Sequence, residues 1–308
     1  MRKTSLDEVF KSAKKDERIF FIGSDLGVGT LQDFKETIPE RFFVEGISEA
    51  NVLGMAAGLA LEGKIVYVNT IAPFFTRRGF EQIVLDLCLH NVNVRLIANG
   101  GGLVYTPLGP THEVLEDFAV LRPIPNITIV AVADADEMRR LMPLTVDYQG
   151  PIYIRLAKGY DPIVTKDEHS FEIGKGILHK EGKDVLIITT GITLQLALEA
   201  SERLEKVSIS VSLLHLHTIK PLDVDAILTE TEKVQAVVTI EEHYIIGGLG
   251  SAVAEIIAET DHLRGKRFRR IGVPDKFAAQ YGSQKSLMEM FGVSVKNLEH
   301  TIMSMLSK

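Results

Sequence analysis

The chain has 308 residues, of which 45% are hydrophobic, and a formal net charge of −7 at pH 7. This length exceeds what one hydrophobic core usually supports, so we expect two domains. The negative balance, without a block of basic residues, argues against nucleic acid or an anionic membrane as a partner. No apolar run reaches the roughly 18 residues of a membrane span, and no signal core follows Met1, which predicts a cytoplasmic location.

Short apolar runs alternate with segments of helical periodicity along the whole chain. This alternation predicts an α/β fold class with two open, mostly parallel sheets covered by helices on both faces. The runs that we expect to form strands are 18–23, 64–69, 94–98, 127–131, 152–156, 184–190, 207–213, 234–240 and 268–273. Residues 161–175 break the rhythm with Pro162 and several charges. We therefore expect domains at 1–160 and 176–308 with a linker between them.

Residues 45–51 place a carboxylate, Glu49, at the start of a helix expected over 52–61. The following turns carry almost no side-chain bulk, with Gly54 and Gly58 among several alanines. Small residues allow another chain or a flat cofactor to approach the backbone, and a carboxyl group in an apolar surround can share a proton with a ligand nitrogen. An acid in a first helical turn also simply complements the helix dipole, so this segment alone leaves both interpretations open.

Further blocks recur along the chain. They are Phe-Thr-Arg-Arg-Gly-Phe-Glu-Gln at 75–82, Gly-Pro-Thr-His at 109–112, and the segments 150–156, 218–223 and 241–251. Together with the segment around Glu49, they resemble in order the pyrimidine-binding and C-terminal domains of transketolases and deoxyxylulose-phosphate synthases. The resemblance covers nearly the whole chain. It implies a thiamine diphosphate-dependent enzyme that transfers a two-carbon ketol unit.

The resemblance implies roles for individual residues. Glu49 would hold the aminopyrimidine ring of the cofactor as its imino tautomer through a hydrogen bond to a ring nitrogen. Phe75, three residues before Arg78, would stack on the pyrimidine, although a slip of one residue gives this role to Phe74. His112, which follows the Gly-Pro-Thr turn, would face the thiazolium and exchange protons with the donor carbonyl oxygen.

Charged residues are matched in the same way. Arg2, Arg78 and Lys158 correspond to residues near the phosphate groups of cofactor or substrate. Lysine attracts phosphate as a point charge, without the bidentate fork of arginine. Asp25 stands where relatives place an acid near the cofactor, and it is equally a candidate helix cap.

Three positions depart from the family pattern. Asn51 and Gly100 stand where many relatives have histidine or arginine, and Leu108 stands where they use an aspartate to bind a substrate hydroxyl. A hydroxyl left unpaired against leucine costs roughly 1 to 3 kcal/mol. We therefore expect a phosphorylated but unusual ketose or aldose as the small-molecule substrate.

The family holds the cofactor diphosphate and Mg²⁺ on a separate domain with a Gly-Asp-Gly signature. No Gly-Asp-Gly occurs in these 308 residues. The expectation is the C-terminal subunit of a split transketolase, completed by an N-terminal diphosphate-binding subunit that carries the Mg²⁺ ligands. An α2β2 heterotetramer in which this chain self-associates follows from it. Two alternatives remain: the β-subunit of a 2-oxo acid dehydrogenase, and a non-catalytic regulatory subunit that has lost substrate contacts.

The remaining motifs give weaker indications of function. His215 and His217 alternate on or just after an expected strand, but no acid or cysteine completes the set, so we expect no metal site there. His243 receives no chemical role. The glycines at 247–250 lead into a helix and are typical of a tight strand-to-helix turn rather than of a dinucleotide site, which belongs in a first βα unit.

Overall fold

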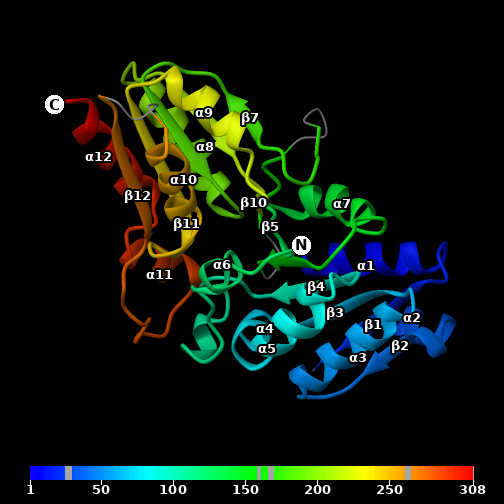
Figure 1. The fold of residues 1–308 in the computed structure, drawn as a ribbon. Coiled ribbons are helices and arrows are strands. Elements are labelled where there is room, and N and C mark those ends of the chain that lie inside the picture. The colour runs from blue at the N-terminus through cyan, green and yellow to red at the C-terminus, as the bar shows by residue number, and fades with distance from the viewer. Residues whose placement is uncertain (25–29, 158–160, 166–169, 261–264, 308) are drawn as a thin grey trace.

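The computed structural model describes residues 1–24, 30–157, 161–165, 170–260 and 265–307. It contains two mostly parallel sheets flanked by helices, which confirms the expected fold class (Figure 1). The first sheet has the order β10-β5-β6-β4-β3-β1-β2 and the second the order β12-β11-β8-β9-β7. Within the described residues, no helix is long and apolar enough to cross a bilayer.

The first sheet is built mainly from the N-terminal half of the chain. Its strands are Ile19–Gly23 (β1), Phe42–Val44 (β2), Ile65–Ile71 (β3), Val94–Asn99 (β4), Thr128–Ala131 (β5), Ile152–Leu156 (β6) and Thr218–Lys220 (β10). The central strands β4 and β6 are buried along their whole length. Near-continuous apolar runs of this kind are what a parallel sheet covered on both faces requires.

The second sheet comes from the C-terminal half. Its strands are Ile177–Lys180 (β7), Val185–Thr189 (β8), Val211–His215 (β9), Ala236–Tyr244 (β11) and Arg267–Val273 (β12). The sequence predicts a strand from Val207, but the chain first makes a turn at Ser208, which has a positive φ of 64°. The strand therefore starts later and includes His215.

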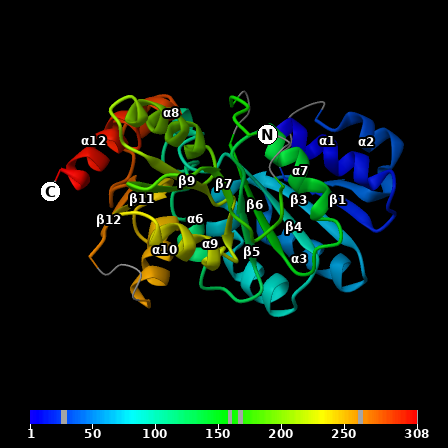
Figure 2. The same ribbon diagram turned by 90° about the horizontal axis from the view of Figure 1, so that it is seen from above.

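Helices cover both faces of the two sheets. In the first half they are Arg2–Ala13 (α1), Gln32–Thr37 (α2), Glu49–Leu61 (α3), Ala72–Arg78 (α4), Phe80–Gln82 (α5), Asp117–Leu121 (α6) and Ala135–Leu144 (α7), with short segments Pro39–Arg41 (η1), Ile83–Leu89 (η2) and Thr106–Leu108 (η3). In the second half they are Thr193–Glu205 (α8), Val224–Glu232 (α9), Leu249–Ala258 (α10), Gln284–Met290 (α11) and Val295–Leu306 (α12). Figure 2 shows α1 beside α7, on the face opposite α3.

A short strand from the second half completes the first sheet. β10 pairs antiparallel with β5, and the amine of Lys220 donates to the backbone carbonyls of Arg122 and Ile124. Apolar side chains then continue from one sheet to the other, since Val130 of the first and Ile187 of the second belong to one buried cluster. The two halves therefore form one continuous body.

Candidate active site

Glu49 is the first residue of α3 and lies beyond the carboxyl end of β2. Its side chain is only 4% exposed. The Ser24 hydroxyl lies 3.4 Å from Oε1, and the guanidinium of Arg78 donates to Oε2 at 3.2 Å. The chain reaches this position through Gly46, whose φ of 56° lies in the left-handed region that glycine adopts without cost. The fold therefore presents one nearly buried carboxylate at the edge of the sheet.

Arg78 joins Glu49 to an aromatic ring. Its guanidinium carbon lies 4.1 Å from the ring centroid of Phe74, within the range of a cation–π contact. The ring of Phe74 in turn meets the imidazole of His112 edge-on, with centroids 5.4 Å apart and an interplanar angle of 71°. Glu49, Arg78, Phe74 and His112 thus form one contiguous row, which we call the Glu49 row.

His112 is held by the loop that follows η3. Its Nδ1 lies 2.9 Å from the Thr111 hydroxyl, and its backbone N–H donates to the carbonyl of Gly109. Arg77 fixes the same loop to α4, because it donates to the Glu116 carboxylate at 2.6 Å and to the Glu113 carbonyl at 2.9 Å. Arg77 therefore positions the loop that carries His112.

The two neighbouring phenylalanines lie in different surroundings. Phe75 is fully buried in the core beneath α4, whereas Phe74 is partly exposed and contacts both His112 and Arg78. Successive residues of a helix point about 100° apart, so only one of the pair can face the Glu49 row in this arrangement. The stacking role of Phe75 stays a prediction, and the arrangement favours Phe74.

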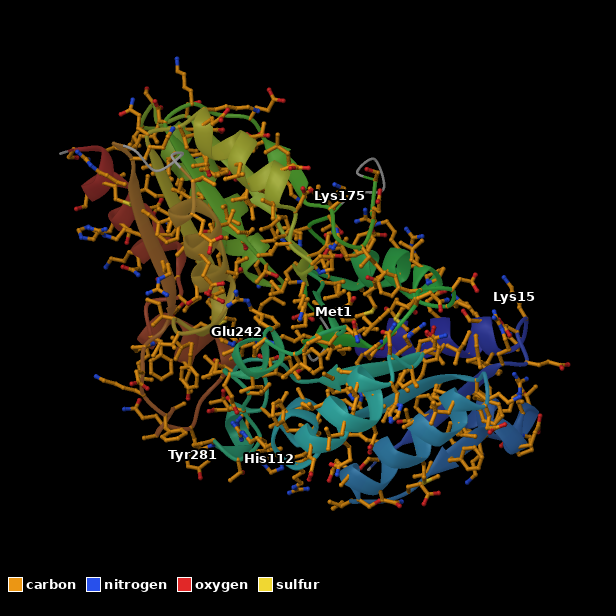
Figure 3. The ribbon with its side chains drawn as sticks, in the orientation of Figure 1. Met1, Lys15, His112, Lys175, Glu242 and Tyr281 are labelled. Atoms are coloured by element: carbon orange, nitrogen blue, oxygen red, sulfur yellow. The ribbon has the colours of Figure 1, made fainter. Side chains whose placement is uncertain are left out.

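Arg2, another predicted phosphate contact, does not join the Glu49 row. Arg2 begins α1 and lines a cavity of about 370 Å³ together with residues of α2. Among the contacts found in the described ranges, none connects it with Glu49, Phe74 or His112, and Met1 beside it lies away from His112 in Figure 3. Asp25 and Lys158 lie outside the described residues.

A residue of the second domain reaches the His112 loop. Tyr281, on the loop after β12, packs against Gly109, where an added Cβ would lie 3.2 Å from the tyrosine ring. Figure 3 shows Tyr281 next to His112, and the tyrosine is 74% exposed. Its hydroxyl lies 3.4 Å from the same added Cβ, one residue after Leu108 in the chain. Sequence reasoning missed Tyr281 because no local pattern marks a contact between opposite halves of the chain.

A buried polar cluster joins the two domains behind this loop. Nε of Arg155 lies 3.0 Å from the Asp117 carboxylate, and the Tyr153 hydroxyl donates to the same oxygen at 2.9 Å. Arg155 also donates to the backbone carbonyl of Glu242 at 2.8 Å. Burial raises the pKa of Asp117 despite the neighbouring guanidinium. Fully enclosed polar groups of this kind stay in place only when they are paired.

Glu242 links this cluster to the His112 loop. Its carboxylate accepts from the backbone N–H of Leu103 and from the side chain of Gln284, both at 2.9 Å. Leu103 follows Gly102, which forms a backbone bridge with Val114 across the loop. Burial raises the pKa of Glu242 to about 7, and the charge of Arg155 only partly opposes this shift. Glu242 is thus a positioning residue that lies between the two domains (Figure 3).

His243 has a structural role in the same place. Its ring stacks on Phe118 of α6, with centroids 5.1 Å apart and an interplanar angle of 3°. Nδ1 donates to the carbonyl of Tyr244 at 2.6 Å, and Nε2 accepts from the N–H of Ala119 at 3.3 Å. Burial lowers the pKa of His243 to about 3, so the imidazole is neutral. It fastens the second sheet to α6.

The glycine turn at 247–250 already holds an anion from the chain itself. The Glu241 carboxylate accepts from the backbone N–H groups of Leu249 at 2.6 Å and Gly250 at 2.7 Å, at the start of α10. An added Cβ at Gly248 would collide with that carboxylate. The amides that would bind a phosphate are therefore occupied, in agreement with a tight turn.

The paired histidines also have partners within the protein. His215 Nε2 lies 3.3 Å from the buried Glu137 carboxylate of α7. His217 stacks on Phe171 with centroids 4.0 Å apart, and burial lowers its pKa to about 4. Both residues thus belong to the contact between the domains.

Sequence comparison agrees with this geometry. Residues 1–160 match the transketolase pyrimidine-binding domain and residues 174–298 match the transketolase C-terminal domain. The chain therefore belongs to the transketolase family. The match extends over both sheets and includes every element of the Glu49 row.

Similar proteins are subunits of split transketolases. The 6-deoxy-6-sulfo-D-fructose transketolase subunit SqwH of Clostridium sp. (strain MSTE9) is 36% identical over 97% of this chain and 92% of its own length. One of the subunits of the apulose-4-phosphate transketolase of Phocaeicola vulgatus is 34% identical over 100% of this chain and 97% of its own. A solved structure of a split-gene transketolase, an inactive β4 tetramer, superposes with a TM-score of 0.91 at 34% identity and covers 99% of this chain and 98% of that one.

Proposed function

We propose that this chain is the C-terminal subunit of a thiamine diphosphate-dependent transketolase that moves a two-carbon ketol unit between anionic sugar-like carbonyl compounds. The observation that carries the proposal is the Glu49 row. It joins a nearly buried carboxylate, a guanidinium, a partly exposed aromatic ring and an imidazole within one run of contacts. The resemblance to the transketolase family implies roles at the cofactor or substrate for Glu49, Arg78 and His112, and for Phe75, the neighbour of Phe74.

The residues fit the pyrimidine half of the cofactor. Glu49 offers a carboxyl group that can share a proton with a ring nitrogen, and Phe74 or Phe75 offers a ring face for stacking. An added Cβ at Gly54 or Gly58 would meet nothing within 4 Å, so the adjoining face of α3 is open. When bound, the cofactor supplies a carbon nucleophile that allows the bond beside a ketone carbonyl to be cleaved.

The chain's own residues then have separate tasks. Glu49 holds the proton on the pyrimidine nitrogen, and His112 moves a proton at the donor carbonyl oxygen, which an imidazole can do near neutral pH. Arg77 keeps the loop of His112 in position. Tyr281 borders this loop from the second domain and offers a hydroxyl to the substrate where relatives use an aspartate.

A negatively charged group on the substrate is the natural partner of the arginine in the row. Arg78 is half exposed, so its guanidinium can turn from Glu49 to an arriving anion. Arg2 and Lys158 remain candidates for further contacts. The names of the two relatives specify a sulfo sugar and a sugar phosphate. These names support a donor or acceptor with an anionic tail, and Leu108 favours an unusual one.

In this proposal, a second polypeptide binds the cofactor diphosphate and Mg²⁺. The chain lacks Gly-Asp-Gly. Ile47 and Leu61, at the two ends of α3, are 71% and 60% exposed, and the glycines between them leave the helix surface flat. Such a surface suits the N-terminal subunit and a second copy of this chain in an α2β2 heterotetramer.

Calorimetry with the full chain tests whether cofactor binding requires both subunits. The isolated chain should bind thiamine diphosphate weakly, and a mixture with a Gly-Asp-Gly subunit should bind it tightly in a Mg²⁺-dependent manner. The mixture should then release a two-carbon-shortened aldose from a ketose phosphate. Tight, Mg²⁺-dependent binding by the isolated chain would refute the split-subunit proposal. Oxidative decarboxylation of a 2-oxo acid would instead identify a dehydrogenase β-subunit. Absence of turnover in a complex that assembles would identify a regulatory subunit.

A further inference from the structure

A basic cavity lies in the second domain between β12 and α12. Its volume is about 480 Å³. β12 is the edge strand of its sheet, and with α12 it forms the outer side of the second domain, away from α4 (Figure 1). A volume of this size lies within the roughly 300 to 1,000 Å³ of small-molecule sites. The cavity is therefore separate from the Glu49 row and large enough for more than a single ion.

The strand side of the cavity carries positive charge. Arg267 and Arg269 alternate along β12 with Phe268, so both point to the face that also carries Ile271. Ile271 is buried in the core cluster that contains Leu298 and Ile302 of α12. The two guanidinium groups thus extend along the helix from that buried contact.

The helix side carries a matching stripe of polar groups. Asn297, His300, Thr301 and Ser304 all line the cavity, and their spacing of three, four and seven residues places them on one face of α12. They offer an amide, an imidazole and two hydroxyl groups. Glu299, an acidic residue of α12, points away from the cavity. Its carboxylate lies 3.6 Å from the guanidinium of Arg203 in α8.

The two arginines have no acidic partner in the described part of the chain. Among the described residues, Arg269 donates only to the carbonyl of Phe268, and no ion pair formed there involves Arg267 or Arg269. Many other arginines of this acidic protein are paired, as Arg122 is with Glu255 at 2.5 Å and Arg203 with Glu199 at 2.6 Å. Of the lining residues that belong to the described ranges, none is an acid. Uncompensated cations facing hydroxyl and amide donors form a receptor for a multivalent anion.

We propose that this cavity binds a small phosphate ester, with the phosphate on Arg267 and Arg269 and the organic part along the stripe of α12. The alternative is that the edge strand β12 pairs with β12 of a second copy of the chain. The arginine side chains of the two strands would then face and repel each other, and charged side chains on edge strands typically prevent such pairing. The charge and the volume together favour the ester.

Titration calorimetry on the full chain, without any partner subunit, tests the proposal. The probes are inorganic phosphate, ribose 5-phosphate and adenosine 5′-monophosphate, and the two esters distinguish a sugar phosphate from a nucleotide. At least one ester should bind saturably and more tightly than inorganic phosphate, with affinity that falls as salt is added. The variant Arg267→Gln/Arg269→Gln should weaken this binding by about tenfold to a hundredfold.

Two matched variants locate the ligand. Arg203→Gln removes an exposed arginine outside the cavity and should leave affinity unchanged, as should Arg78→Gln in the Glu49 row. Should the double variant lose its fold in a thermal melt, Arg269→Gln and His300→Ala replace it, because both side chains are exposed. The proposal is overturned if neither ester binds, if inorganic phosphate binds as tightly as both, or if Arg78→Gln abolishes binding that the cavity variants retain. The last result would assign the ligand to the candidate active site.

Discussion

Arg78 donates to Oε2 of Glu49 at 3.2 Å although the two side chains differ greatly in exposure, at 50% and 4%. The carboxylate is fixed by the fold, whereas the guanidinium can leave it at little cost, since pairs open to solvent contribute only about 0 to 1 kcal/mol. In the proposed function, Arg78 exchanges Glu49 for an anionic group of the substrate when the cofactor takes the carboxyl group.

The first prediction concerns this exchange. Arg78→Gln should shift the melting temperature by less than about 3 °C, because the lost pair is half exposed. It should raise the KM for the anionic substrate by about tenfold or more, since a charged hydrogen bond is worth about 1.5 to 3 kcal/mol. Arg77→Gln is the matched variant, and it should lower kcat instead by loosening the loop of His112. Steady-state kinetics of the reconstituted complex that show the reverse pattern would contradict these roles.

The second prediction separates the adjacent phenylalanines. Phe74→Ala should preserve stability and weaken cofactor binding by about 0.5 to 1.5 kcal/mol beyond the loss of contact area, through lost stacking. Phe75→Ala should lower the free energy of unfolding by about 3 to 5 kcal/mol, because its fully buried ring would leave a cavity. Thermal melts and cofactor titration of the complex measure both effects. A stable Phe75→Ala variant with weakened cofactor binding would return the stacking role to Phe75.

Local sequence accounts for much of the Glu49 row. Glu49 is marked by the small residues of α3, and Phe74, Phe75 and Arg78 lie within one helical turn and a half. The sequence could not choose between the phenylalanines, because that choice depends on which side of α4 faces the core. His112 follows a Gly-Pro-Thr turn, but its proposed role comes from the resemblance to transketolases and not from the turn alone.

Contacts between distant segments could not be predicted in this way. β10 has three residues, too few for a period, and it joins the first sheet only because β5 offers an open edge. Tyr281 meets Gly109, and Glu242 meets Leu103, across the domain boundary. The pairing of such groups is set by how the two sheets pack, and no spacing along the chain records it.

The third prediction concerns pH. The pKa of Glu242 rises from its ordinary value of 4.5 to about 7 in the folded chain, because the side chain is buried. The folded state therefore keeps a proton that the unfolded state releases, and the stability that this group contributes below its unfolded pKa is lost as pH rises through about 7. Glu242→Gln is neutral throughout. Between about pH 5 and about pH 8, the melting temperature of the variant should rise relative to that of the parent as pH rises. A constant difference would mean that Glu242 is ionised over the whole range.

The fourth prediction concerns Tyr281. Tyr281→Phe removes the hydroxyl but keeps the ring against Gly109, so stability should not change. If the hydroxyl binds the substrate, kcat/KM should fall by about twofold to tenfold, as expected for one neutral hydrogen bond. Phe277→Leu, on the same loop and 79% exposed, is the control and should have no effect. Equal losses in both variants would indicate that the loop acts only through its packing.

The most direct test of the proposed function is the exchange of the thiazolium carbon proton with deuterium in the reconstituted complex, measured for the parent and for Glu49→Gln. The amide is nearly isosteric, so the fold and the assembly should be preserved, while the proton shared with the pyrimidine nitrogen is lost. We expect exchange and ketol transfer to slow together by about 10²- to 10⁴-fold, as is typical for the loss of one acid–base group. Exchange at the parent rate in Glu49→Gln would show that Glu49 is only a helix-terminal acid and would contradict the proposed function of the site.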